Sequence, residues 1–106
     1  MLTSGQRAFL RGLANSLDPV IMVGKGGVTD TVIEGAENAI KPRELIKGRA
    51  LEASPVTSGE AARLIAEGIG ADVVQVIGRC FLLYKPNPEK KKEEASVSYM
   101  LKRGVK

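Results

Sequence analysis

The sequence has no histidine and no tryptophan, and Cys80 is its only cysteine. A single cysteine excludes an internal disulfide. Without histidine the chain cannot build thiolate–imidazole zinc sites, Ser-His-Asp triads or Cys-His pairs. We therefore expect a protein that is not an enzyme and that needs no metal or other cofactor. Cys80 opens an apolar segment, and we interpret it as a small buried hydrophobic residue.

Long hydrophobic runs and aromatic residues are also scarce. No stretch approaches the ~18 consecutive apolar residues that a membrane-spanning helix needs, and Met1–Ser4 does not resemble the start of a secretory signal. These absences predict a cytoplasmic protein without a membrane contact. Aromatic residues make up 4% of the chain, too few for an interleaved platform on which single-stranded nucleic acids stack. Tyr84 could stack one base, but packing in the core or at its rim is the favoured interpretation.

The net charge of +4 is unevenly distributed. Basic and acidic residues almost balance up to residue 85, whereas residues 86–106 hold six basic and three acidic side chains. The length and composition fit one globular domain, which we place at residues 1–86, followed by a charged, disordered tail over 87–106. The run Lys90–Lys92 is either solvated or adds affinity for phosphate. Any polyanion site in the domain must therefore come from clustered cations.

The pattern of apolar residues predicts the order helix–strand–helix–strand–helix–strand–strand. Each strand–helix–strand step should lead to a parallel strand, and the last two strands should form an antiparallel hairpin with a type II′ turn at Gly78-Arg79. The expected fold class is therefore α/β, a two-layer sandwich with a four-stranded mixed sheet. If both crossovers progress the same way, the second and third helices share one face, while the place of the first helix stays open. The predicted helices are 3–17, 29–41 and 57–69, and the predicted strands are 20–23, 44–53, 73–77 and 80–84.

The second predicted strand carries two cations on one face. Alternation places Lys47 and Arg49 together with Leu45, on the side opposite Ile46 and Gly48. Glycine is unusual inside a strand, and Gly48 therefore indicates a bulge or a close approach by another group.

The segment Gly24-Lys25-Gly26-Gly27 links the first strand directly to the second helix. Three glycines in four positions let main-chain N–H groups approach an anion closely, and the helix behind them presents the positive end of its dipole. We expect the amides of Gly26 and Gly27 to hold one or two phosphates, with Lys25 adding a full charge. A plain strand-to-helix turn is the alternative interpretation.

The spacing of this loop selects among phosphate-binding motifs. A Walker motif needs Gly-x-x-x-x-Gly-Lys-Ser/Thr, and a dinucleotide fingerprint needs a glycine where this chain has Thr29. The spacing that fits is Gly-x-x-Gly, which KH-type modules use to clamp a nucleic-acid backbone.

Five blocks of the chain are similar to one family in the same order, namely Gln6–Ala14, Val23–Thr29, Glu44–Lys47, Val74–Gly78 and Leu83–Pro86. Over roughly residues 2–86 the chain resembles the bacterial YhbY-type single-domain members of the CRM (chloroplast RNA splicing and ribosome maturation) family. The resemblance implies an RNA-binding domain with a fold like the C-terminal domain of translation initiation factor three. It also implies association with ribosomal RNA in precursors of the large ribosomal subunit. We expect a monomer with no small-molecule substrate.

The expected RNA surface combines the glycine loop with cations from other elements. Arg7 and Arg11 lie four residues apart, so they should share a helix face turned away from the apolar stripe. Each cation could also be a solvated surface residue, and Lys47 and Arg49 could extend over apolar neighbours. Two other functions remain open: a protein-docking module on a ribosomal particle, and a binder of a small phosphate ligand. The predicted RNA-binding residues are Arg7, Arg11, Gly24, Lys25, Gly26, Gly27, Lys47, Arg79 and Lys85.

Overall fold

The computed structural model describes residues 3–87, and the elements within that range follow the predicted order. The predicted tail over 87–106 lies almost entirely outside the described residues. The helices are α1 (Ser4–Ala14), α2 (Asp30–Arg43) and α3 (Ser58–Ile69), and the strands are β1 (Ile21–Val23), β2 (Leu45–Ala50), β3 (Asp72–Ile77) and β4 (Cys80–Tyr84).

The four strands form one mixed sheet in the order β1-β2-β4-β3. β1 and β2 are parallel, whereas β4 is antiparallel to both of its neighbours. The last strand therefore inserts between β2 and β3, which run in the same direction without touching. The predicted mixed sheet and its strand directions are confirmed. The hairpin between β3 and β4 pairs Ile77 with Cys80, and Gly78 has a φ of 56°, as a type II′ turn requires at its first central residue.

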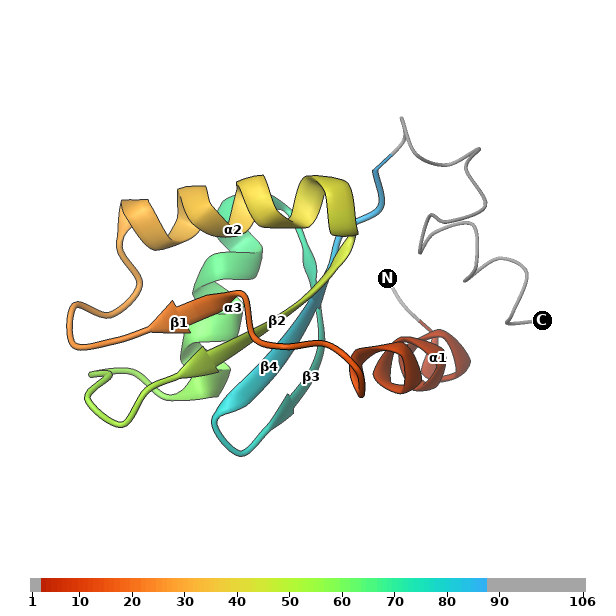
Figure 1. Ribbon diagram of the computed structural model, residues 1–106, viewed down its shortest axis with the longest axis horizontal. Coiled ribbons are helices and arrows are strands. Elements are labelled where there is room, and N and C mark those ends of the chain that lie inside the picture. Colours follow the sequence, from red (N-terminus) through yellow and green to blue (C-terminus); the bar gives the residue numbers. More distant parts are fainter. Residues whose placement is uncertain (1–2, 88–106) are drawn as a thin grey trace.

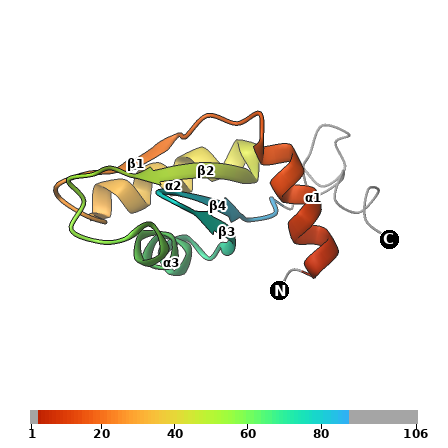
Figure 2. The ribbon, with the colours of Figure 1, turned by 90° about the horizontal axis from the view of Figure 1, so that it is seen from below.

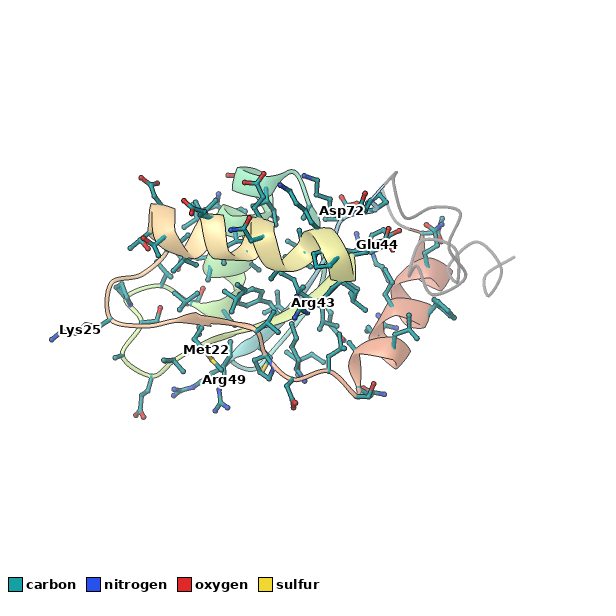
Figure 3. The ribbon with its side chains drawn as sticks, turned by 45° about the horizontal axis from the view of Figure 1, so that its top comes forward. Met22, Lys25, Arg43, Glu44, Arg49 and Asp72 are labelled. Carbon is teal, nitrogen blue, oxygen red and sulfur yellow. The ribbon has the colours of Figure 1, made fainter. Side chains whose placement is uncertain are left out.

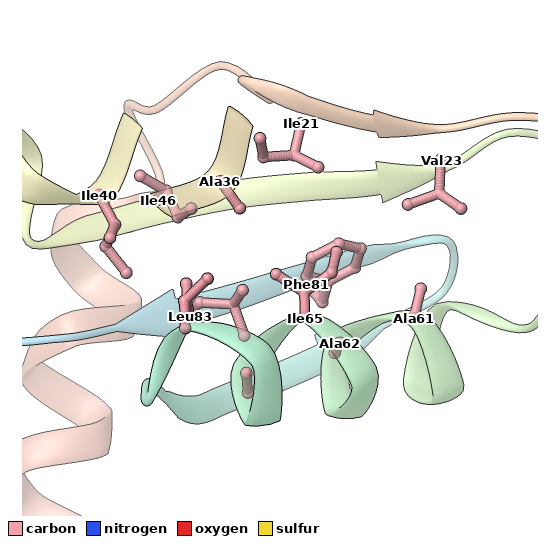
Figure 4. Packing of buried hydrophobic residues seen from close by; sticks show 12 residues of the cluster. Ile21, Val23, Ala36, Ile40, Ile46, Ala61, Ala62, Ile65, Phe81 and Leu83 are labelled. Carbon is pink, nitrogen blue, oxygen red and sulfur yellow. The ribbon is translucent and has the colours of Figure 1, made fainter. Parts of the chain in front are cut away.

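α2 and α3 cover one face of the sheet and enclose the main core (Figures 1 and 4). The fully buried side chains of Phe81, Leu83 and Ile65 lie in this layer. α1 packs on the opposite face, at the end of the sheet away from the loop before α2 (Figure 2). There Leu10 of α1 packs with Tyr84 of β4. The predicted packing of the second and third helices on one face is confirmed, and α1, whose place was left open, adds a partial layer on the other face.

Gly48 is the point of closest approach in the sheet. It pairs directly with Phe81, and a Cβ atom added to Gly48 would overlap the Phe81 ring. The ring therefore occupies the space that a side chain on Gly48 would take. The predicted close approach at Gly48 is confirmed, and it explains the glycine in a strand interior.

All three helices begin after a threonine cap, at Thr3, Thr29 and Thr57. Each hydroxyl oxygen accepts a backbone N–H from the first turn, at 3.1 Å, 3.2 Å and 3.1 Å in turn. These bonds satisfy donors that a helix start leaves without an intrahelical partner. The local chain chemistry thus sets the three helix starts.

The end of α2 differs from the prediction. The helix continues through Pro42 to Arg43, and Glu44 ends it with a φ of 64° instead of opening the strand. Glu44 is buried, and its carboxylate accepts the Asn87 N–H at 2.7 Å while its carbonyl accepts the Lys85 N–H at 2.8 Å. These bonds tie the α2–β2 junction to the chain that leaves β4.

Candidate nucleic-acid interface

The glycine loop is a tight turn that leaves β1. The Gly27 N–H donates to the Gly24 carbonyl at 2.9 Å, and Gly27 has a φ of 73°. We expected this amide to hold a phosphate, but in the structure it closes the turn. Gly27 is required for a different reason: its backbone conformation is left-handed, and an added Cβ would lie 3.2 Å from Pro55 Cγ.

The tip of the loop is open to solvent. Lys25 and Gly26 are exposed, and the Lys25 side chain extends outward from the body of the protein (Figure 3). Neither backbone amide donates to another backbone group within residues 3–87. Asp30 already places a carboxylate at the start of α2, where it complements the helix dipole. The loop amides and Lys25, more than the helix end, therefore carry any affinity for an anion.

Two other turns lie beside the glycine loop. Gly24 approaches Leu51 in the segment after β2, and Gly27 approaches Pro55 in the same segment. The β3–β4 turn joins this end of the sheet, since the Ala50 N–H donates to the Arg79 carbonyl at 2.7 Å. The exposed side chain of Arg79 therefore lies at the same end of the sheet as the glycine loop.

The face of the sheet opposite α2 and α3 carries the two predicted cations. Arg49 is exposed and Lys47 is half-buried, and Figure 3 shows Arg49 and Met22 on the side of the sheet away from α2. Met22 pairs with Arg49, Arg49 with Cys80, and Cys80 with Ile77. This row is open, because Met22 is 50% and Ile77 62% exposed. Cys80 is half-buried, not fully buried as expected.

The two arginines of α1 have different environments. The Arg7 guanidinium donates to the Val73 carbonyl at 2.7 Å and to the Val74 carbonyl at 3.1 Å. The expectation that Arg7 turns away from the packed side of the helix is therefore wrong, because it ties α1 to β3. Arg11 is exposed, and it lines a pocket together with Lys47 of β2.

Lys85 also serves the fold. Its ammonium group donates to the Ile69 carbonyl at 2.7 Å, and a cation at the C-terminus of α3 is favoured by the helix dipole. The predicted site residues that stay available thus fall into two neighbouring groups. The loop end holds Gly24–Gly27 and Arg79, and the open sheet face holds Lys47 and Arg11.

Sequence reasoning missed the polar residues beside these cations. Asn15 at the end of α1 and Gln75 of β3 line the same pocket as Arg11 and Lys47. Gln75 had a detectable signal, because it is the one polar residue between Val73 and Ile77. Simple alternation would put the side chains of Val73 and Gln75 on the same face of the sheet. A register shift between these two residues changes this, so the face on which Gln75 lies could not be predicted from the sequence.

Residues 3–87 lack two further kinds of feature. None of the helices in this range is long and apolar enough to cross a membrane. The same residues contain no group of three or more Asp, Glu, Cys or His side chains placed to hold a metal ion.

Comparison with known proteins identifies relatives along nearly the whole chain. The model of the CRS1 / YhbY (CRM) domain matches residues 2–85. The Bacillus subtilis protein named "Probable RNA-binding protein YqeI" is 39% identical over 94 residues, which cover 89% of this chain and 98% of the relative. A Haemophilus influenzae protein named "RNA-binding protein" is 39% identical over 90 residues, covering 85% of this chain and 91% of the relative.

A solved structure is similar in fold as well as in sequence. The solution structure of the hypothetical protein SAV1595 from Staphylococcus aureus matches with a TM-score of 0.72 and 35% identity. The match covers 87% of this chain and 96% of that structure. The helix and strand order described above is thus shared with an experimentally determined relative.

Proposed function

The chain belongs to the CRS1/YhbY (CRM) domain family, and on that premise we propose that it is an RNA-binding protein that holds the RNA backbone at the glycine loop. The names of the Bacillus subtilis and Haemophilus influenzae relatives support RNA as the ligand. The proposal includes no catalytic step and no cofactor.

The observation that carries the proposal is the placement of the cations that the fold leaves available. Lys25 and Arg79 lie at the loop end of the sheet, and Arg49, Lys47 and Arg11 continue along the open face. In contrast, Arg7 and Lys85 donate to backbone carbonyls, and Arg63 on α3 pairs with Glu67. Lys41 and Arg43 lie outside this set, at the end of α2. The five cations of the loop end and the open face form a track that suits the spaced phosphates of a polynucleotide better than a single small anion.

In the proposed complex, the Gly26 amide and Lys25 hold one phosphate, and Arg49 and Lys47 follow the adjoining strand. Such contacts position a protein on RNA without reading its bases, so selectivity comes from the shape of the folded RNA. The family resemblance supports ribosomal RNA in precursors of the large ribosomal subunit as the partner, with the protein acting in the cytoplasm as a monomer.

The loop is tested by placing negative charge where phosphate should lie. Gly26 suits this test, because an added Cβ would meet only Thr29 Cγ2, at 3.7 Å. Gly27 does not, because substitution there would strain the backbone and press on Pro55. We expect the double variant Lys25→Glu/Gly26→Asp to lose most of its affinity for precursor large-subunit RNA in a filter-binding titration, with an unchanged melting curve in circular dichroism.

The matched control, Lys41→Glu/Gly35→Asp, makes the same change in charge on α2, where Lys41 is exposed. Gly35→Asp lies on exposed α2, where an added Cβ meets nothing within 4 Å. This control should bind RNA as the unmodified protein does. If the Lys25→Glu/Gly26→Asp protein binds with full affinity, the loop is only a structural turn.

One observation favours protein docking as a second candidate function. Met22 and Ile77 are large apolar side chains that stay exposed on the open face. A docking module would still sediment with large-subunit particles after Lys25→Ala and Arg11→Ala, whereas the RNA-binding function predicts release of the variant from those particles. The small phosphate ligand is less suited to the loop, because the Gly27 amide is already used.

A further inference from the structure

A pocket of about 200 Å³ lies where α1 meets the open face of the sheet. α1 covers the row formed by Leu45 and Tyr84, and the pocket lies beyond it, over the next cross-strand rows. Its lining residues come from α1, β2, β3 and β4: Arg11, Ala14, Asn15, Lys47, Gln75, Ile77, Cys80, Phe81 and Leu82.

The volume of the pocket limits it to small ligands. Sites for drug-sized molecules occupy about 300–1,000 Å³, so a volume of about 200 Å³ suits one planar ring system and not a whole nucleotide. Ala14, Leu82 and Ile77 give the pocket apolar surface on which such a ring can lie.

The polar groups of the pocket match the edge of a nucleobase. Asn15 and Gln75 each offer a carboxamide, which can donate and accept hydrogen bonds at the same time. Bases in unpaired RNA are recognised by hydrogen bonds to their edges combined with contact to their faces. The two amides come from separate parts of the fold, the C-cap of α1 and strand β3, and both line the pocket.

The charge around the pocket has one sign. Arg11 and Lys47 are its only charged lining residues, and both are cations. Arg49 precedes the pocket on the way to the glycine loop, since it pairs with Cys80 in the register of β2 and β4. A base that enters here therefore brings its flanking phosphates beside cations, which an apolar peptide side chain would not use.

Resting on the RNA-binding function proposed above, we propose that this pocket receives one unpaired base of the bound RNA. Asn15 and Gln75 contact the edge of the base, and Arg11 and Lys47 hold the phosphates on either side of it. The glycine loop then binds the backbone, while this pocket is the place where the protein senses an unpaired nucleotide.

Cys80 provides a direct test, because it lines the pocket and is the only cysteine of the chain. The rate at which iodoacetamide alkylates Cys80 is measured with the protein alone, with large-subunit ribosomal RNA, and with heparin. Heparin is a polyanion without bases, and it is used at the concentration that displaces the RNA. We expect RNA to slow the alkylation severalfold and heparin to leave the rate close to that of the free protein.

A control reporter places the thiol on the other layer. In the variant Cys80→Ser/Asn38→Cys the single thiol lies on the exposed side of α2, and RNA should leave its alkylation rate unchanged. Equal protection of both thiols would overturn the pocket, because the RNA would then cover the protein without selectivity.

A second arm removes the base contacts without touching the thiol. We expect Asn15→Ala/Gln75→Ala to weaken RNA binding by about 2- to 12-fold for each hydrogen bond lost, while heparin binding stays the same. The variant Asn38→Ala is the matched control and should bind both ligands normally. A melting curve in circular dichroism checks that each variant is folded.

The outcomes separate the two proposals. If RNA binds but leaves Cys80 freely reactive, or if heparin protects Cys80 equally, the pocket does not hold a base, although RNA binding stands. If RNA leaves the alkylation rate of Cys80 unchanged but purified large-subunit proteins lower it, the pocket is a docking site for protein. If the unmodified protein does not bind RNA in the filter assay, the proposed function fails, and the base pocket fails with it.

Discussion

Removal of one cation from the proposed RNA surface should change the slope of log affinity against log salt by a predictable amount. Five cations are available on the loop end and the open face, and each phosphate contact contributes about 0.7 to 0.9 to the slope of log affinity against log salt. The unmodified protein should therefore show a slope of about −3.5 to −4.5, so its affinity falls roughly 100- to 500-fold between 50 and 200 mM salt. Arg49→Gln should reduce the slope by about 0.7 to 0.9, because Arg49 is exposed on the open face and is not needed in the core.

The control for this prediction is a cation of the opposite layer. Arg63 is exposed on α3, where it lies 3.5 Å from Glu67, so Arg63→Gln should leave the slope unchanged. Both variants lose one positive charge and keep similar side-chain length, so a change in total charge cannot explain a difference. Filter-binding titrations at several salt concentrations measure the slopes. A slope near zero for the unmodified protein, or equal changes for the two variants, would refute the assignment of the RNA surface.

Two predictions concern the fold that supports this surface. Gly48→Ala should lower the free energy of unfolding by about 1–3 kcal/mol, because its Cβ overlaps the buried Phe81 ring. Adding Phe81→Leu to this variant should recover part of the loss. If the two substitutions have additive effects on the free energy of unfolding in urea denaturation, the direct contact is contradicted. Thr57→Ala should cost about 1 kcal/mol, because the Glu60 N–H loses its partner at 3.1 Å; an unchanged denaturation midpoint would show that this cap contributes nothing.

Local chemistry made several features of the fold predictable. A threonine hydroxyl at the start of a helix satisfies N–H groups two or three residues away, so Thr29 and Thr57 mark helix starts without knowledge of the tertiary structure. The hairpin at Gly78 is equally local, because a two-residue link with glycine first fits one turn type. Gly48 predicted a close approach by another group. Phe81 could not be predicted as that group, because β2 and β4 pair across more than thirty residues of sequence.

The parts of the site that could not be predicted depend on tertiary contacts. Arg7 and Arg11 are alike in the sequence, and only the packing of α1 against β3 gives Arg7 two backbone carbonyls and leaves Arg11 exposed. The role of Lys85 was unpredictable for the same reason, because its ammonium group donates to the Ile69 carbonyl at the end of α3, far away in the sequence. Gly27 looked like a phosphate-binding glycine, but its amide closes the turn. Spacing alone does not distinguish a cation that binds a ligand from one that holds the fold.

The arrangement of the two layers explains how a nearly neutral domain can attract a polyanion. Five carboxylates lie on the two helices that cover one face of the sheet, namely Asp30, Glu34, Glu37, Glu60 and Glu67. The same helices also carry Lys41, Arg43 and Arg63. At the loop end and on the opposite face the five cations outnumber the exposed carboxylates Asp18 and Glu52, so positive charge is in excess on that side. Such a domain orients in the field of an RNA with its cation-bearing side forward, although its net charge is small. Because α1 covers only part of that side, the same packing that buries Leu10 leaves Arg11 and Lys47 at the edge of an open pocket.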